Sequence, residues 1–208
     1  MLRNTLYIFG SVVIFFAGVI CYGIVLNLRE VTLSEALAEK GIKELKDVRI
    51  VIDRKNYKLN LYSQGILIKD YKAVFGKNNN VIKTTADDNV TPIGDYKICA
   101  IDTTSHYHKF LHLNYPNERD AAEALARGYI NQDEFSSILL SAKLNECPPT
   151  ETRLGSSIGI HGIGKYNIIF KNLPFSFNWT DGSIAVSNEN IDELYSVVKI
   201  GTPVKIIN

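Results

Sequence analysis

The feature this 208-residue sequence most clearly lacks is net charge. Its 23 basic and 22 acidic residues leave a formal charge of +1, so no strong field favours nucleic acid as the main partner. Internal repeats and low-complexity tracts are also absent. For a chain of this length, one domain with an appendage is therefore the expected organisation.

Cysteine is scarce as well, with Cys21, Cys99 and Cys147 only. None of them belongs to a CxxC motif or to a cysteine–histidine series, so a zinc site is not indicated. Cys99 and Cys147 fall in the predicted globular part, where an oxidising compartment would let them pair if their Cα atoms come close enough. Their spacing in the sequence leaves that pairing open.

Residues 4–28 contain no charged side chain. A helix of that length, rising about 1.5 Å per residue, crosses the roughly 30 Å of hydrocarbon in a bilayer. A cleaved signal peptide has a shorter apolar stretch and a small-x-small exit, and neither is found here. The sequence before Cys21 is also a poor lipoprotein box. We therefore predict a transmembrane anchor at residues 1–28.

The remainder divides into a helical stalk at residues 29–46 and a globular domain at residues 47–208. Thr32 and Glu35 form a capping-box pattern that predicts a short helix in the stalk. From Val48 onward apolar residues alternate with polar ones, which is typical of strands in antiparallel hairpins. Strands are expected within residues 48–53, 57–61, 66–75, 95–101, 157–161, 167–170 and 204–207.

Helices are expected between these strands, each beginning at a capping residue: Asn117, Asn131 or Ser187. Pro148-Pro149 is expected to end the second of them. The predicted fold class is mostly β with inserted helices, preceded by one transmembrane helix.

Four motifs occur in a characteristic order: Thr91-Pro92-Ile93-Gly94-Asp95-Tyr96, Tyr115-Pro116-Asn117, Ile158-Gly159-Ile160-His161-Gly162 and Trp179-Thr180-Asp181-Gly182-Ser183-Ile184-Ala185-Val186-Ser187-Asn188. Together they resemble the L,D-transpeptidase family, whose catalytic domain is also called YkuD-type. The resemblance extends over residues 47–207. It implies a β-sandwich or barrel-like catalytic domain that acts on peptidoglycan stem peptides.

The resemblance also implies a mechanism. In the family, a cysteine attacks the carbonyl of the L-centre residue in a tetrapeptide stem. The terminal D-alanine leaves, the acyl group passes to an amine or to water, and a histidine transfers the proton. His161 matches that histidine, and a histidine at a strand end can titrate near neutral pH. The simpler alternative is a buried histidine satisfied by main-chain hydrogen bonds.

Ser183 stands where the family has its cysteine. A thiol beside histidine can ionise, whereas a serine hydroxyl must lose its proton during attack to a base that a third group orients. Asp181 is the candidate orienter on proximity alone. The Gly-x-Ser-x-Gly elbow of serine hydrolases is lacking. Three interpretations stay open: a retuned nucleophile, a pseudoenzyme that binds muropeptides or regulates an active relative, and a substitution peculiar to this sequence.

The other predicted site residues surround this pair. We expect the backbone of Gly182 and Ser183 to form the oxyanion site. Gly162 is expected to leave room for a substrate backbone, whereas for Trp179 ordinary packing is the preferred interpretation. The predicted substrate-binding residues are Tyr96, His112, Gly162, Thr180 and Asp181.

His106, His108 and His112 would share one face of an extended strand, which suggests a metal site. No carboxylate is spaced to complete the ligand set, so we prefer a place in the substrate cleft and expect no metal or cofactor. Cys147 is a poor substitute nucleophile because it precedes Pro148 in an inserted loop.

The expected location is the bacterial inner (cytoplasmic) membrane, with a single span and the domain on the periplasmic side. The positive-inside rule does not decide the orientation, because Arg3 lies on one side and Arg29, Lys40 and Lys43 on the other. Neither the acyl acceptor nor the oligomeric state follows from the sequence.

Overall fold

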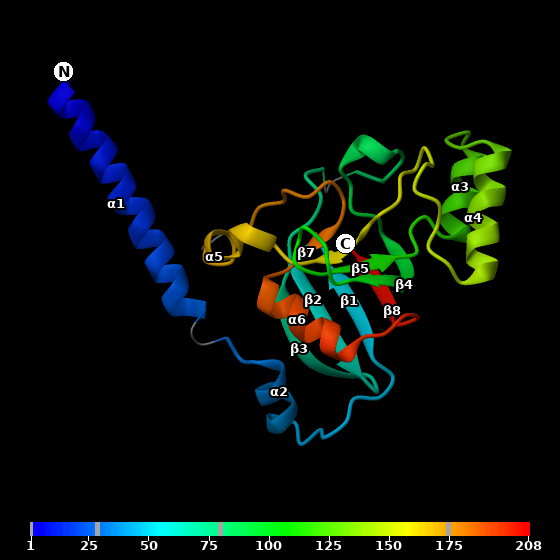
Figure 1. The fold of residues 1–208 in the computed structure, drawn as a ribbon, viewed down its shortest axis with the longest axis horizontal. Coiled ribbons are helices and arrows are strands. Elements are labelled where there is room, and N and C mark those ends of the chain that lie inside the picture. The colour runs from blue at the N-terminus through cyan, green and yellow to red at the C-terminus, as the bar shows by residue number, and fades with distance from the viewer. Residues whose placement is uncertain (1, 28–29, 79–80, 174–175) are drawn as a thin grey trace.

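A computed structural model of the protein describes residues 2–27, 30–78, 81–173 and 176–208 (Figure 1). A long helix, α1 (Leu2–Asn27), projects from one end of a domain built on a curved sheet. The helices α3 (Glu118–Ala126) and α4 (Gln132–Leu144) pack together at the opposite end (Figure 1). The mostly β fold with inserted helices is as predicted.

In the described part of the chain, eight strands form one sheet in the order β3-β2-β1-β8-β4-β5-β6-β7. The pairs β1–β8 and β6–β7 are parallel, and the other neighbours are antiparallel. The strands are β1 (Arg49–Asp53), β2 (Lys58–Ser63), β3 (Ile66–Lys72), β4 (Gly94–Asp102), β5 (Phe110–Leu113), β6 (Gly159–His161), β7 (Ile184–Ala185) and β8 (Pro203–Ile207). The predicted hairpins at the start of the domain are confirmed.

The two edges of this sheet meet at the segment after β3. Val74 and Ala185 exchange both main-chain hydrogen bonds, of 3.0 and 2.9 Å, and so join the β3 end of the sheet to β7. Gly76 forms a second bridge with Thr180. The sheet therefore curls into the half-barrel that the family resemblance implied, and the segment around residue 183 lies where its edges meet.

The predicted capping residues begin the helices as expected. Thr32, Asn117, Asn131 and Ser187 each accept a hydrogen bond from a main-chain N–H in the first turn that follows. Such caps satisfy N–H groups that have no partner inside the helix. The remaining helical elements are α2 (Leu33–Glu39), α5 (Asn167–Phe170), α6 (Asn188–Val197) and the 3₁₀ turns η1 (Ala86–Asp88) and η2 (Gly164–Tyr166).

Two groups of buried side chains hold the domain together. The main core lies between the sheet and α6, whose Ile191 and Leu194 are fully buried. Leu33 of α2 joins this core, and the Glu193 carboxylate accepts from the Leu33 N–H at 2.9 Å and from the Lys69 ammonium at 2.6 Å. The segment predicted as a stalk thus packs its helix onto the domain. A smaller core lies under α3 and α4.

One predicted strand and one predicted helix end are wrong. Residues 167–170, expected as a strand, form the short helix α5. Asn167 holds this turn through its side chain, which bonds the Asn188 N–H and the Glu189 carboxylate, both distant in sequence. The helix α4 ends at Leu144 and not at the two prolines, because Asn145 adopts the left-handed conformation with φ of 56°.

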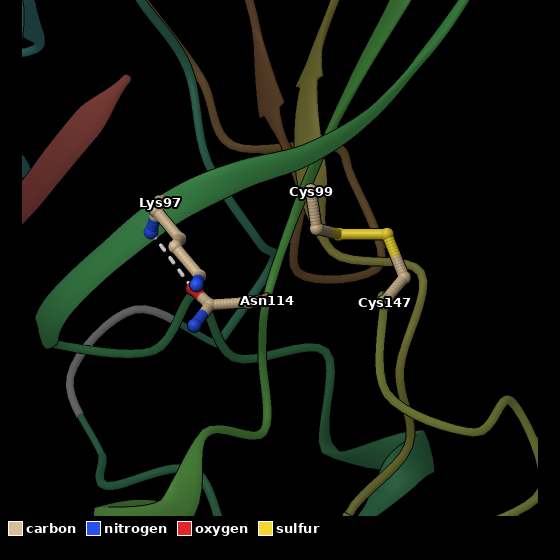
Figure 2. Close-up of a disulfide and its surroundings, with 4 residues drawn as sticks. All are labelled: Lys97, Cys99, Asn114 and Cys147. Carbon is tan, nitrogen blue, oxygen red and sulfur yellow. Dashed lines mark hydrogen bonds between the residues drawn. A yellow bond between two sulfur atoms is a disulfide. The ribbon is translucent and has the colours of Figure 1, made fainter. Parts of the chain in front are cut away.

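A disulfide joins Cys99 and Cys147, whose Cα atoms are 5.2 Å apart (Figure 2). It connects β4 to the segment that follows α4. Nearby, the Lys97 N–H donates to the Asn114 side chain at 2.7 Å, which ties β4 to the residue after β5. The pairing that the sequence left open is thus made, and it fastens the helical insertion to the sheet.

Candidate active site

Strands β6 and β7 bring the segments that hold His161 and Ser183 side by side. They pair in parallel, with Ile160 opposite Ile184 and His161 opposite Ala185. Both isoleucines are fully buried in the core, so alternation along β6 turns His161 to the other face, and Ser183 directly precedes β7.

His161 is enclosed by aromatic rings and only 2% exposed. Its ring centroid is 4.5 Å from that of Tyr107, 5.3 Å from the stacked Phe110 and 6.0 Å from the edge-on Trp179. This burial lowers the pKa of His161 to about 4, because charging the imidazole there would cost its hydration. The side chain is therefore neutral at pH 7.

A main-chain carbonyl orients this imidazole. Nδ1 of His161 lies 2.7 Å from the oxygen of Gly162. A carbonyl oxygen only accepts, so Nδ1 carries the proton of the neutral ring and Nε2 keeps its lone pair as a base. Asp181, our candidate for this role, instead pairs with the Lys77 ammonium at 2.7 Å and is 80% exposed. The orienter is thus Gly162.

The hydroxyl of Ser183 has two main-chain neighbours. It accepts from the Gly159 N–H at 3.2 Å and donates to the Ser157 carbonyl oxygen at 3.4 Å. Ser157 reaches this position because its backbone is left-handed, with φ of 58°. The hydroxyl proton therefore points toward Ser157 and not toward the imidazole, and its long hydrogen bond leaves it free to rotate.

The loop before Ser183 is shaped by Thr180 and Gly182. The Thr180 hydroxyl donates to the Ser183 carbonyl at 2.6 Å and accepts from the Gly182 N–H at 3.3 Å. Gly182 has φ of +124°, and a Cβ there would come within 2.9 Å of the Val90 oxygen, so only glycine fits. Two amides, those of Gly182 and Ser183, are predicted to form the oxyanion site. The Gly182 amide already donates a long hydrogen bond to the Thr180 hydroxyl.

Gly162 does not provide the substrate space that we predicted. A Cβ at this position would lie 2.7 Å from the Asn188 side-chain oxygen and 2.8 Å from the Tyr107 carbonyl oxygen. Protein atoms therefore fill the place of the missing side chain. The glycine is required because α6 and the turn before β5 approach the backbone closely.

His112 lies on the same face as His161. It is opposite Gly159 in the β5–β6 pairing, and its ring is 4.4 Å from that of Phe110. Burial lowers the pKa of His112, and the Asp102 carboxylate opposes that shift. A neutral, partly exposed imidazole thus lies beside the site, where the sequence analysis expected a substrate-binding residue.

Tyr96 is not brought to this face. Its ring is buried edge-on against Tyr115, and its hydroxyl lies 3.3 Å from the Ile93 carbonyl oxygen and 3.4 Å from the Asp120 carboxylate. Burial raises the pKa of the Tyr96 hydroxyl far above its usual value. Its described contacts are those of a packing residue on the α3 side of the sheet.

Several contributors escaped the sequence analysis: the Gly162 carbonyl, Ser157 and the rings of Tyr107 and Phe110. Phe110 carried a usable signal, since it alternates with His112 along one strand face. The others arise from turns that bring main-chain atoms together, for which the sequence has no pattern. Trp179, for which ordinary packing was the preferred interpretation, contacts the imidazole and lines a pocket.

A pocket of about 120 Å³ opens beside this face. Trp179 and Ala185 separate it from His161, and Phe170 and Phe177 form its apolar wall. A metal site is not supported: within the described ranges, no three histidine, cysteine or carboxylate side chains are grouped to hold an ion. His106 and His108 lie in a turn and not on a strand, and His108 contacts Asp192.

The family model of the L,D-transpeptidase catalytic domain, YkuD, matches residues 47–206. The chain belongs to this family. Family membership makes it a relative of acyltransferases that act on peptidoglycan. That Ser183 and His161 stand at the positions of the family's nucleophile and base stays a prediction from the sequence motifs.

Several solved structures are similar to this chain. Bd1075 of Bdellovibrio bacteriovorus is 21% identical with a TM-score of 0.48, over 78% of this chain and 48% of that one. The helical cell shape determining protein Pgp2 of Campylobacter jejuni is 18% identical with a TM-score of 0.48, over 84% and 54%. A cysteine-to-serine mutant of the Enterococcus faecium L,D-transpeptidase is 15% identical with a TM-score of 0.44, over 78% and 50%.

This chain thus spans about half the length of those three proteins. Among curated proteins, none matches it.

Proposed function

We propose that the protein transfers acyl groups of peptidoglycan stem peptides, with Ser183 as the nucleophile and His161 as its base. The observation that carries this proposal is the parallel register of β6 and β7, which pairs His161 with Ala185, two residues after Ser183. The hydrogen bond from Nδ1 to Gly162 supports it further, because Nε2 is left as the basic nitrogen.

In the proposed reaction the Ser183 hydroxyl rotates away from Ser157 as a stem peptide binds. Its oxygen attacks the carbonyl carbon of the L-centre residue, and its proton passes to Nε2 of His161. The oxyanion is held by the amides of Gly182 and Ser183, the first of which exchanges Thr180 for the substrate. The C–N bond then breaks, and the terminal D-residue leaves with the proton from His161.

An ester on Ser183 remains. An amine of a second stem, or water, attacks this ester while His161 takes its proton and returns it to the serine oxygen. Substrate contacts are proposed for His112, Thr180 and Asp181, with Gly162 acting through the imidazole it orients. Tyr96 would act only by supporting the strand that leads to the cleft.

A second candidate is a catalytically silent domain that binds stem peptides or regulates an active relative. It is favoured by the Ser183 hydroxyl, whose described hydrogen bonds go to Ser157 and Gly159. The low pKa of His161 also favours it, since a base with a pKa of about 4 accepts a serine proton poorly. For Ser183 to act as a nucleophile, bound substrate must raise the pKa of the His161 imidazole.

Acylation separates the two candidates. The protein is incubated with a tetrapeptide stem or a carbapenem, and its intact mass is measured. Acyl transfer predicts an adduct on Ser183 that is absent from Ser183→Ala and slowed about 10²- to 10⁴-fold in His161→Gln. An adduct found only in Ser183→Cys would show that the scaffold is intact but the serine is silent.

We propose further that α1 anchors the protein in the inner (cytoplasmic) membrane, with the domain on the outer side. The span Arg3–Val25 is long and apolar enough to cross a bilayer, although the same test is passed by a signal sequence. The disulfide between Cys99 and Cys147 supports an oxidising, extracytoplasmic location. The anchor would occupy residues 1–28 and the domain residues 47–208.

A further inference from the structure

Four large apolar or aromatic side chains are exposed together near α5. Ile168 is 68% exposed, and its neighbours are also open to solvent. We call the set Tyr166, Ile168, Ile169 and Phe177 the α5 surface. Phe177 connects it to the pocket beside Trp179, because Phe177 and Phe170 both line that pocket and their rings lie tilted, with centroids 5.7 Å apart. An exposed apolar cluster of this kind is typical of an interaction surface.

The α5 surface lies at the level of the last turns of α1. A Cβ added to Gly23 would lie 1.8 Å from the carbonyl oxygen of Asn172, so the two backbones touch. Gly23 is four residues before the end of α1 at Asn27, which places this contact about 6 Å from the helix end. Figure 1 shows α5 beside the domain-facing end of α1.

The chain also returns to the domain at once. Glu30, three residues after α1, accepts a hydrogen bond from the Asn190 side chain, and Leu33 is already in the core. At no more than about 3.6 Å per residue, the six residues from Asn27 to Leu33 span at most about 22 Å. A domain tied this closely cannot leave the bilayer that holds α1.

We propose that the α5 surface rests on the lipid bilayer in which α1 is inserted. This inference depends on the anchor proposed above, but not on catalysis at Ser183. Aromatic residues such as Tyr166 favour the membrane–water interface, where a ring sits among headgroups. Lys165, which lies 4.9 Å above the Tyr166 ring, places its ammonium beside the lipid phosphates, and Lys171 borders the other end of α5.

Docking has a consequence for the site. The pocket beside Trp179 shares Phe177 with the α5 surface, and Trp179 contacts His161. A bilayer against this surface therefore fixes the orientation of the β6–β7 face relative to the membrane. It also holds the site close to the membrane, so that only stem peptides of membrane-proximal peptidoglycan come within reach.

Spin-label depth measurement tests the proposal on the full chain. In a Cys21→Ser background, Ile168→Cys is labelled with a nitroxide and reconstituted into vesicles of phosphatidylethanolamine and phosphatidylglycerol. The matched control is Leu140→Cys, an aliphatic position on α4 that is 58% exposed and lies at the far end of the domain. A third label at Phe15→Cys reports on α1. The disulfide leaves Cys99 and Cys147 unlabelled.

The proposal predicts several-fold fewer collisions with a water-soluble nickel complex at position 168 than at position 140, and more with oxygen. It is overturned if positions 168 and 140 are equally accessible to nickel while position 15 is shielded, in which case the anchor stands and the surface is free or meets another protein. If position 15 is accessible as well, the anchor fails and the bilayer contact fails with it. Acylation of Ser183 is not affected by either result.

Discussion

The family resemblance predicts a cysteine at position 183, where this chain has a serine, and under the proposed function this one difference decides how much the surrounding residues must do. A thiol can be ionised by a neighbouring imidazole before substrate arrives, whereas a serine loses its proton only during attack. The imidazole of His161 is well oriented by Gly162 but is a weak base because three rings bury it. Under the proposed function, the orientation of the His161 imidazole favours acyl transfer, whereas its low basicity suits a thiol better than a hydroxyl.

The buried imidazole makes stability depend on pH in a defined direction. Burial lowers the pKa of His161 to about 4, whereas in the unfolded chain this pKa is about 6.5. Between these values the unfolded state binds the additional proton, so lowering the pH from 7 to 4 destabilises the fold by up to about 3 kcal/mol. Above pH 6.5 this effect is absent.

Denaturant unfolding between pH 4 and 8, followed by Trp179 fluorescence, measures this slope. In His161→Gln the loss of stability between pH 6.5 and 4 is expected to be smaller than in the wild type by that amount. Parallel curves for the two proteins would show that the histidine is not buried as described. Other titrating groups are common to both proteins and cancel in the comparison.

Among the elements, the α3–α4 insertion is packed apart from the main core. It has a small core of its own, which includes Ala121 and Ile138. The disulfide from Cys99 to Cys147 joins the end of this insertion to β4, the strand that pairs with β5 and hence leads to the site. The disulfide therefore adds a covalent attachment to an insertion whose own apolar core is small.

Removing this link is expected to lower stability by about 2–4 kcal/mol. The two cysteines are 48 residues apart, and a cross-link over such a loop restricts the unfolded chain considerably. Urea midpoints of the wild type with and without reducing agent provide the measurement. The C99S/C147S double variant serves as control, since reducing agent must leave its midpoint unchanged. Equal midpoints for oxidised and reduced wild type would contradict the prediction.

For the whole molecule, the open question is whether α1 stays attached. As an uncleaved span, α1 places the domain next to the membrane. As a signal sequence it would be removed, and the domain would diffuse through the envelope. The absence of a small-x-small exit and the contact of Gly23 with Asn172 both favour retention.

Intact mass and membrane extraction decide between these fates. We expect the purified protein to retain residues 1–28 and to stay in the membrane pellet after alkaline carbonate treatment. The reason is that an apolar helical span of 23 residues inserts stably into a bilayer. A variant that lacks residues 4–25 should appear in the soluble fraction. A wild-type protein whose mass corresponds to a chain that starts after residue 25 would rule out the anchor.

Much of this protein follows from local patterns. Period-two alternation predicts the first hairpins, and capping residues such as Asn117 and Asn131 predict the starts of helices, because these signals act between neighbours in the chain. The family motifs point to His161 and Ser183 for the same reason: each motif is a short stretch whose residue types are visible directly.

Other features depend on contacts between distant segments, which no local pattern encodes. The register of β6 against β7, the proton of His161 held by Gly162 and the pairing of Cys99 with Cys147 all required the folded chain. Asn167–Phe170 became a helix because Asn167 bonds residues in α6. Residue types can be read singly, but hydrogen-bond partners and the burial that lowers a pKa exist only once remote segments of the chain have met.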